Sequence, residues 1–409
     1  MEVFVITRKQ YYAADDDDDN DLDVVVIGGD DADIYLQIHN NSLKFIINSS
    51  LSIVKGLLQR IQDGETVIVA EGYIFAFERL GYLKAGPFTP EVVVDHPELV
   101  RQMYKDFVRA GSDVVQAFTY YGNRNKFKLV GREDELEKQN RLALKMAREV
   151  ADETGTLMCG DLSNTWVYEP GNEEAIAETK SMFKEQIEWA VDEGADFIVG
   201  ETFGHFEEAL LAAKAIKEHG QGVPAVITLG THYSQKTPDG KPTTADGVEL
   251  NEALRRLVEG GADVVGFNCT RGPLSMIPVL ESAVEANIGA PLAALPVLYR
   301  TTAEEPSFFD LPDPWTGERA FPLDLDCLLC SRRDVVKFTE RCAQLKIPYV
   351  GLCCGNAPHY TRAMAETLGR VTEASKYSPD MSLHGMYGTD DTKLTTYYTK
   401  LYQTATTKK

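Results

Sequence analysis

Apolar and polar residues follow two regular patterns along most of the chain. From about Glu65 onward, short runs of β-branched and other apolar residues alternate with longer segments of helical period. The first pattern is typical of buried strands, and the second of amphipathic helices. We expect strands at residues 66–72, 113–121, 156–163, 196–203, 225–230, 263–270, 290–298 and 349–355. We expect helices at residues 96–110, 133–154, 175–193, 206–218, 250–260, 276–286, 334–345 and 358–368.

Eight strand-helix units in one continuous stretch predict an α/β fold of the (β/α)8 TIM-barrel type. A doubly wound open sheet would place a glycine-rich phosphate turn after its first strand, and the sequence AEGYIF at that point lacks one. Three helices end in the related phrases RAGSDVV, DEGADFIV and EGGADVVG, where glycine can cap the helix before the next buried strand. The long interruption at residues 299–333 falls between strand seven and helix seven, the side on which barrels carry their active-site loops.

The two ends of the chain differ from this repeating part. Residues 1–60 contain the aspartate run Asp15 to Asp19 and no clear partner pattern, which predicts an acidic and partly disordered extension. Residues 61–370 hold the barrel. Residues 371–409 form a polar tail with several tyrosines, which we interpret as a short C-terminal arm that packs or contacts another subunit, so we expect a homo-oligomer.

Charge and composition exclude several classes of protein. With 63 acidic and 41 basic residues, the net charge is -22 and would repel a nucleic acid. The longest apolar runs are far shorter than the roughly 20 residues that span a bilayer, and the N-terminus lacks the pattern of a secretory signal. We therefore expect a cytoplasmic protein without a membrane or nucleic-acid partner. Seven cysteines without a framework spacing favour reduced thiols, available for metal binding or catalysis.

Three cysteines fall at the carboxyl ends of predicted strands. Cys269 ends strand six, and the pair Cys353-Cys354 ends strand eight, so all three open onto the same rim of the barrel. Three thiolate ligands with one open position are typical of a catalytic zinc site. Bound Zn2+ would lower the pKa of an incoming thiol and hold it as the nucleophilic thiolate. Because adjacent strand residues face opposite sides, we expect a bend at the pair, which Gly351 and Gly355 would permit.

Other interpretations of these residues stay open from the sequence alone. Buried cysteines often serve as small apolar residues. A non-catalytic, structural zinc barrel would need a fourth protein ligand, for which His205 or His359 could reach, and both could join His232 in proton handling. Cys327 and Cys330 form a C-x-x-C in the long loop without a second pair, and we interpret them as incidental.

Polar and aromatic residues at other strand ends indicate a substrate site on the same rim. Glu201 ends strand four and could receive the ammonium group of an amino-acid substrate, while Glu71 closes strand one and Asn268 could orient a ligand. Tyr121 ends strand two, and Phe88 stands in AGPFTP, before that strand. Aromatic faces suit a cationic onium donor through cation–π attraction of roughly 0.5–2 kcal/mol each.

Four segments, GYLKAGPFTPEVVVDHPELVRQ, GSDVVQAFTYY, VGFNC and YVGLCCGNAPHYTRAMAE, resemble the betaine-homocysteine S-methyltransferases within the homocysteine S-methyltransferase family. The resemblance covers about residues 62–370. It implies a (β/α)8 barrel, Zn2+ on three cysteines, and homocysteine thiolate as the fourth ligand. It also implies direct methyl transfer from an onium donor, glycine betaine, to give methionine and dimethylglycine, with S-methylmethionine or another sulfonium compound as the alternative donor.

The resemblance assigns roles residue by residue. Three residues match the zinc ligands of the family: Cys269, Cys353 and Cys354. Glu201 matches the acid that binds the homocysteine amino group, and Tyr121 matches a tyrosine near the betaine site. Phe88 stands where the animal betaine enzymes have tryptophan.

Two positions depart from the family pattern. The first strand of the family usually ends in Asp-Gly-Gly or Asp-Gly-Ala, and its aspartate helps to bind homocysteine. Here the matching residues are Ala70, Glu71 and Gly72, so we expect Glu71 to act from the neighbouring position. The tyrosine that follows the strand-four glutamate in the animal betaine enzymes is Thr202 in this chain.

Overall fold

The computed structural model describes residues 23–29, 32–39, 42–48, 54–231, 236–385, 387–389, 397, 400 and 401. The chain divides into two compact units, Met1–Gly56 and Leu57–Lys409. The first unit contains three antiparallel strands, in which β2 (Ala32–His39) pairs with both β1 (Asp23–Gly29) and β3 (Ser42–Asn48). The aspartate run at residues 15–19 lies outside the described residues, so partial disorder of residues 1–60 stays a prediction.

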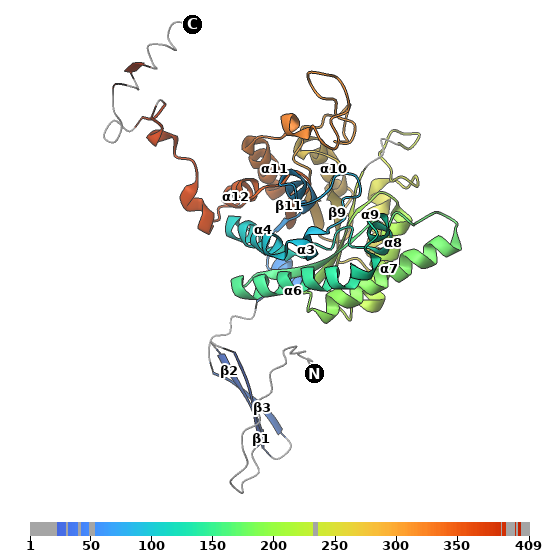
Figure 1. Cartoon of the computed structure of the whole chain (residues 1–409), viewed down its shortest axis with the longest axis vertical. Coiled ribbons are helices and arrows are strands. Elements are labelled where there is room, and N and C mark those ends of the chain that lie inside the picture. The colour runs from blue at the N-terminus through green and yellow to red at the C-terminus, as the bar shows by residue number, and fades with distance from the viewer. Residues whose placement is uncertain are drawn as a thin grey trace. The chain divides into compact units, whose positions relative to one another are not determined.

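The second unit contains the predicted barrel. Its eight parallel strands close in the order β10-β11-β4-β5-β6-β7-β8-β9 (Figure 1). These strands are β4 (Val67–Ala70), β5 (Val114–Gln116), β6 (Leu157–Ser163), β7 (Phe197–Phe203), β8 (Ala225–Leu229), β9 (Val264–Asn268), β10 (Leu292–Leu295) and β11 (Tyr349–Leu352). Each lies inside a segment predicted from the sequence, and the predicted (β/α)8 fold is confirmed.

The helices surround the strands (Figure 1). The eight predicted helices correspond to α4 (Pro97–Ala110), α6 (Leu136–Thr154), α7 (Glu173–Asp192), α8 (Phe206–His219), α9 (Leu250–Glu259), α10 (Pro273–Glu285), α11 (Arg332–Gln344) and α12 (Pro358–Thr367). Shorter helices were not predicted, because so few turns show no clear period. They are α1 (Leu57–Gln62), α2 (Tyr73–Arg79), α3 (Val92–Asp95) and α5 (Arg124–Leu129), with 3-10 turns at Glu133–Glu135, Leu325–Leu328, Glu373–Tyr377 and Met381–Leu383. Within the described part of the chain, no helix combines the length and apolar character that a bilayer crossing requires.

Alternating strand residues divide the core into an inside and an outside. Val67 and Val69 of β4 pack with apolar residues of the other strands in the barrel interior. Ile68 and Ala70 of the same strand belong to the larger cluster between the strands and the surrounding helices. Leu57 of α1 packs with the interior cluster, so this short helix covers the amino end of the barrel.

The repeated Gly-Ser-Asp and Gly-Ala-Asp phrases fasten the amino ends of neighbouring strands. Three aspartates, which precede β5, β7 and β9, are Asp113, Asp196 and Asp263. Each accepts a hydrogen bond at Oδ2 from a backbone N–H of the adjacent strand, at 2.7, 2.7 and 2.9 Å. The N–H of each aspartate donates to the carbonyl of the same strand residue at 2.8 Å. Arg370 pairs with Asp113 at 2.6 Å and Arg148 pairs with Asp196 at 3.0 Å, so two of these charges are also neutralised.

Candidate active site

Three cysteine side chains meet at the carboxyl end of the barrel. The sulfur atoms of Cys269, Cys353 and Cys354 all lie within 4.8 Å of one another. Cys354 Sγ lies 3.8 Å from Cys269 Sγ and 3.8 Å from Cys353 Sγ. Sulfurs placed tetrahedrally at about 2.3 Å from Zn2+ would be separated by roughly 3.8 Å, so the arrangement fits one thiophilic ion.

The backbone around Cys269 is turned out of the strand conformation. Cys269 follows β9, and both it and Thr270 lie in the left-handed region, with φ of 56° and 60°. The Cys269 N–H still donates to the carbonyl of Leu295 at 2.9 Å. This hydrogen bond continues the pairing of β9 with β10 for one residue, while the left-handed turn re-aims the chain at the rim.

Cys353 and Cys354 lie just beyond their strand. β11 ends at Leu352, so the bend predicted within the strand is not required. Cys353 N–H donates to the carbonyl of Pro296, and Leu298 N–H donates to the carbonyl of Cys354, each at 2.8 Å. The pair is therefore held against the segment that follows β10. Hydrogen bonding to Cys269, together with burial, raises the pKa of both cysteines.

Gly72 provides the space in which this pair sits. It precedes α2 with φ of 85°, a conformation that side chains other than glycine adopt at a cost. A Cβ at this position would lie 2.4 Å from the carbonyl oxygen of Cys353 and 2.9 Å from the nitrogen of Cys354. Glycine is required here by a close approach of two backbone segments.

Three buried carboxyl groups gather beside the cysteines. Glu71 and Glu201 each place an oxygen within 4.8 Å of Cys353 Sγ. Gln116 Nε2 donates to Glu201 Oε1 at 2.8 Å and to Asp161 Oδ2 at 3.1 Å, which brings a third acid into the group. Within the described part of the chain, Glu71 Oε1 and Asp161 Oδ1 have no hydrogen-bond partner, and no basic side chain pairs with any of the three acids.

Burial raises the pKa of Glu71, Asp161 and Glu201. Desolvation is the largest cause for each, and repulsion from Glu201 raises the pKa of Glu71 and Asp161 further. Buried carboxylates are stable when a cation or hydrogen-bond donors satisfy them. A ligand ammonium group would supply both, so this cluster fits the amino end of an amino acid.

Asn268 connects the acids to the strand ends. Its Nδ2 donates to Glu201 Oε2 at 2.6 Å and to Glu71 Oε2 at 3.3 Å. Its Oδ1 accepts from the backbone N–H of Thr202 at 2.8 Å and from Thr228 Oγ1 at 2.9 Å. Thr202 Oγ1 donates to Glu201 Oε2 at 3.1 Å. The structure therefore brings together four residues that were singled out separately in the sequence.

The two aromatic candidates lie in the segments that follow two neighbouring strands, Phe88 after β4 and Tyr121 after β5. Tyr121 has φ of 59°, and its ring centroid lies 4.3 Å from that of Tyr120 and 6.4 Å from that of Trp166. Burial raises the pKa of Tyr121 to about 12. Phe88, with φ of 53°, packs against Phe75 at 5.8 Å between centroids.

Sequence reasoning missed two residues of this region, Asp161 and Lys126. Asp161 belongs to β6. The one signal in the sequence that could have found it is an acidic residue in the carboxyl-terminal half of a buried strand. Lys126 is 7% exposed, and its Nζ lies 4.1 Å from the Tyr121 ring centroid and 5.0 Å from that of Trp166. It was not singled out because the sequence NRNKFK is typical of a solvated helix.

The other candidates do not join the cysteines. The metal-capable groups among the described residues include neither His205 nor His359, and His232 lies outside those residues. Cys327 and Cys330 also lie apart from the group. In the described part of the chain the three cysteines thus have no fourth protein ligand, which favours a catalytic rather than a structural site.

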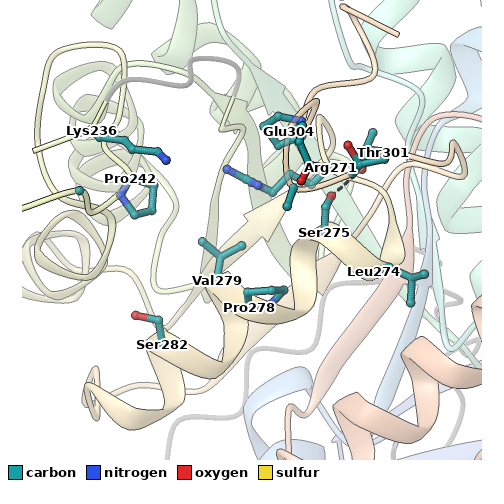
Figure 2. A pocket seen from close by; sticks show the side chains of 14 residues that line it. Lys236, Pro242, Arg271, Leu274, Ser275, Pro278, Val279, Ser282, Thr301 and Glu304 are labelled. Atoms are coloured by element: carbon teal, nitrogen blue, oxygen red, sulfur yellow. Dashed lines mark hydrogen bonds between the residues drawn. The ribbon is translucent and has the colours of Figure 1, made fainter.

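A separate cavity of about 680 Å3 lies along α10 (Figure 2). Lys236 and Arg271 extend into it, and Leu274, Pro278 and Val279 form an apolar side. Arg271 Nε donates to Thr231 Oγ1 at 2.8 Å. None of the three cysteines lines this cavity, so it is distinct from the site described above.

Comparisons with known proteins agree with this arrangement. The family described as homocysteine S-methyltransferase matches residues 65–368 of the chain. Betaine–homocysteine S-methyltransferase 1 of Xenopus tropicalis is 37% identical over 343 residues, which cover 82% of this chain and 80% of that protein. The enzyme of the same name from Mus musculus is 36% identical, covering 82% and 79%. S-methylmethionine–homocysteine S-methyltransferase of Pongo abelii is 32% identical over 339 residues, covering 82% and 86%.

Among solved structures, the metallated form of the homocysteine methyltransferase MmuM from Escherichia coli has a similar fold. The TM-score is 0.57 at 16% sequence identity, with 76% of this chain and 99% of that chain covered. This likeness supports the shared barrel architecture.

Proposed function

The chain belongs to the homocysteine S-methyltransferase family, and we propose that it transfers a methyl group from glycine betaine to the thiol of L-homocysteine. The products would be methionine and dimethylglycine. One observation carries the proposal: a set of three thiols that fits a metal ion lies beside three buried acids without a cation. Homocysteine has a thiol for the first group and an ammonium for the second.

The acid cluster would bind the amino end of homocysteine. Glu201 and Glu71 would contact the ammonium group, and Asn268 donates a hydrogen bond to one oxygen of each. Asp161 is the third acid of the cluster, because Gln116 donates to both Asp161 and Glu201. Because these acids are already in place, an ammonium group would enter a site whose hydrogen-bond acceptors need no rearrangement. Glu71 would supply the contact for which the family usually uses an aspartate one position earlier.

The thiol end would lie at the cysteines. Cys269, Cys353 and Cys354 would hold Zn2+, which when bound supplies a Lewis acid that keeps the homocysteine thiol deprotonated. The chain contributes a fixed position for this sulfur, since backbone hydrogen bonds to the carboxyl end of β10 and to the segment that follows it hold all three cysteines.

Methyl transfer then requires alignment and a dry site. A carbon–sulfur bond forms at homocysteine while the carbon–nitrogen bond of betaine breaks, and the electron pair leaves with dimethylglycine. No side chain has to accept a proton or form a covalent intermediate. We assign the donor side to Tyr121 and Phe88, two partly buried rings that pack against the core and would reduce the access of water to the donor.

S-methylmethionine is the second candidate donor. A relative at 32% identity is named for this donor, and the position after Glu201 is Thr202 rather than the tyrosine of the animal betaine enzymes. The two donors can be compared directly, because both would react with the same homocysteine.

The test is methionine formation by the zinc-loaded protein from homocysteine with one donor at a time. Methionine above the enzyme-free blank with glycine betaine would support the proposal as stated. Product from S-methylmethionine alone would reassign the donor. A protein that binds Zn2+ and forms methionine from neither donor would contradict the proposed function.

Assembly and location are also proposals. The arm at residues 371–409 exposes large apolar side chains among its described residues, including Val371, Tyr377 and Met381. We assign it to contact with a second copy of the chain in a cytoplasmic homo-oligomer, in keeping with seven free cysteines. Light scattering on the full chain and on a chain ending at Arg370 would test the contact; the same number of subunits in both would exclude it.

A further inference from the structure

Lys126 is a buried cation without an anion. Its side chain is 7% exposed, and it forms no ion pair with any acidic residue in the part of the chain that the structure describes. Its neighbours are the rings of Tyr121 and Trp166 and the carbonyl of Pro87, to which Nζ donates at 3.4 Å. Lysine is rarely buried unless it is paired, so this ammonium lacks the partner that would normally accompany it.

The backbone holds this lysine in a defined place. Asn123 caps α5, and its Oδ1 accepts a hydrogen bond from the Lys126 N–H at 3.0 Å. Thr89 Oγ1 donates to the Lys126 carbonyl at 3.3 Å. Both partners are buried, so the lysine is fixed to the loop that carries Phe88 as well as to the loop that carries Tyr121.

Tyr121 is a neighbour of both the lysine and the cysteines. After burial, proximity to Cys269 and Cys354 helps to raise the pKa of Tyr121, and the Lys126 ammonium lies 4.1 Å from the ring centroid of the same residue. By contrast, burial alone lowers the pKa of Lys126 to about 8, with no contribution from the acid cluster. The lysine therefore lies against Tyr121, which neighbours the thiols, and it forms no ion pair with the buried acids.

We propose that the Lys126 ammonium binds the carboxylate of the methyl donor. The inference rests on the proposed function and narrows its donor to onium compounds that also carry a carboxylate. A donor methyl group must approach the homocysteine sulfur in line, so the rest of the donor extends away from the cysteines. A carboxylate on Lys126 would leave the onium group beside Tyr121, between the lysine and the sulfur.

The carboxylate of homocysteine is the competing partner. That carboxylate is attached to the same carbon as the ammonium group, and the ammonium is assigned to the buried acids. Because these acids make no contact with Lys126, the homocysteine carboxylate would have to reach away from its own ammonium group. The donor carboxylate has no such constraint.

The experiment compares Lys126→Met and Lys126→Arg with the wild-type full-length protein loaded with zinc. Lys128→Met is the matched control, because Lys128 lies on the same short helix and is exposed. The Michaelis constants for glycine betaine and for homocysteine are measured separately, with S-methylmethionine in place of betaine if the wild type uses it. Inhibition by tetramethylammonium, which resembles betaine without its carboxylate, provides the second readout.

We expect Lys126→Met to raise the KM for the donor by about 10- to 100-fold, the range for losing a charged hydrogen-bond partner. The homocysteine KM and the inhibition constant of tetramethylammonium should change less than about three-fold, Lys126→Arg should recover most of the donor affinity, and Lys128→Met should match the wild type. These results together would separate carboxylate binding from a structural role, since a distorted site would weaken tetramethylammonium and homocysteine as well.

An unchanged donor KM in an active Lys126→Met enzyme would overturn this inference while leaving the proposed function intact. A rise confined to the homocysteine KM would overturn it too and assign Lys126 to the homocysteine carboxylate. A wild type that forms methionine from neither donor would overturn the proposed function and this inference together.

Discussion

The acidic side chains at the two ends of the barrel are satisfied in opposite ways. At the amino end, Asp113, Asp196 and Asp263 each accept a backbone N–H, and the first two also pair with an arginine. At the carboxyl end, Glu71 and Asp161 keep a carboxyl oxygen without a partner among the described residues. The same kind of side chain stabilises the strands at one end and remains incomplete at the other.

This difference indicates which end of the barrel binds a ligand, without any comparison with a related protein. An aspartate with its hydrogen bonds made needs no ligand. Among the described residues, the buried acids have no cation and the buried lysine has no anion, so a ligand would supply the missing partners. The four predictions that follow test the contrast between the two ends, in order of expected size.

Loss of one sulfur should have the largest effect. Cys354→Ala or Cys269→Ala should abolish zinc retention and lower turnover by more than about 100-fold, since even a residue that merely orients a metal ligand costs about 10- to 100-fold. Metal analysis and methionine formation are the measurements. Cys327→Ala is the control, because Cys327 is exposed and lies apart from the group. Full zinc and activity in either site variant would refute the three-cysteine assignment.

The second largest effect should come from replacing a glycine by alanine, and it should differ between the two ends of the barrel. Gly72→Ala at the carboxyl end would place Cβ 2.4 Å from the Cys353 carbonyl, so we expect impaired zinc binding and a loss of stability above about 3 kcal/mol. Gly64→Ala at the amino end has a similar φ of 81° and open space, and should cost about 1–2 kcal/mol with zinc retained. Urea unfolding with metal analysis is the check; equal losses in both variants would contradict the close approach.

The pH dependence of kcat/KM for betaine should follow the titration of Lys126. Burial lowers the pKa of Lys126 to about 8, so the ammonium is charged below this pH and neutral above it. We expect kcat/KM for betaine to fall about 10-fold from pH 7 to pH 9, because the charged fraction of the lysine falls by that factor. Tyr121, the titratable group that faces the lysine, has its pKa raised to about 12 and stays neutral throughout.

Lys126→Arg provides the control for this profile. Arginine keeps its charge at pH 9, so kcat/KM of the variant for betaine should not fall as the lysine titrates. Titration of homocysteine itself should affect both profiles equally. Identical profiles for the variant and the wild type would remove Lys126 as the cause.

Matched aspartate substitutions should give the smallest effects, with opposite signs. Asp196→Asn should destabilise the protein by about 1 kcal/mol, since it weakens a charge-assisted bond to the Met158 N–H. Asp161→Asn should stabilise the metal-free protein by about 1 kcal/mol at pH 7. The folded state holds the pKa of Asp161 above its unfolded value, so folding is disfavoured as pH rises above about 4, and the amide removes this penalty.

Urea unfolding at pH 7 and at pH 3 would measure both variants. The gain of Asp161→Asn should disappear at pH 3, where the acid is protonated in both states. A loss of stability in this variant at pH 7 would mean that Asp161 is a satisfied structural acid like Asp196.

The barrel was predictable because its strands are short buried runs and its helices are long enough to show their period. The rim residues Cys269, Cys353, Cys354 and Glu201 were also predictable, since a barrel fixes which strand ends face the same side. Lys126 was not, because burial of a lysine depends on rings that lie elsewhere in the chain. The end of β11 before Cys353 was missed for a related reason: strand ends depend on the neighbouring strand and not on local composition.

Closure of the barrel has a consequence for engineering the gene. Because β11 pairs with β4, the two ends of the barrel segment meet, and Arg370 donates to the carbonyl of Thr66 across 304 positions of sequence. A short peptide could join them, and the long loop at residues 299–333 offers a place for new termini. Such a circular permutation would change which strand-helix unit comes first in the gene. It would keep every strand pair, because the strands of a closed barrel form a continuous ring.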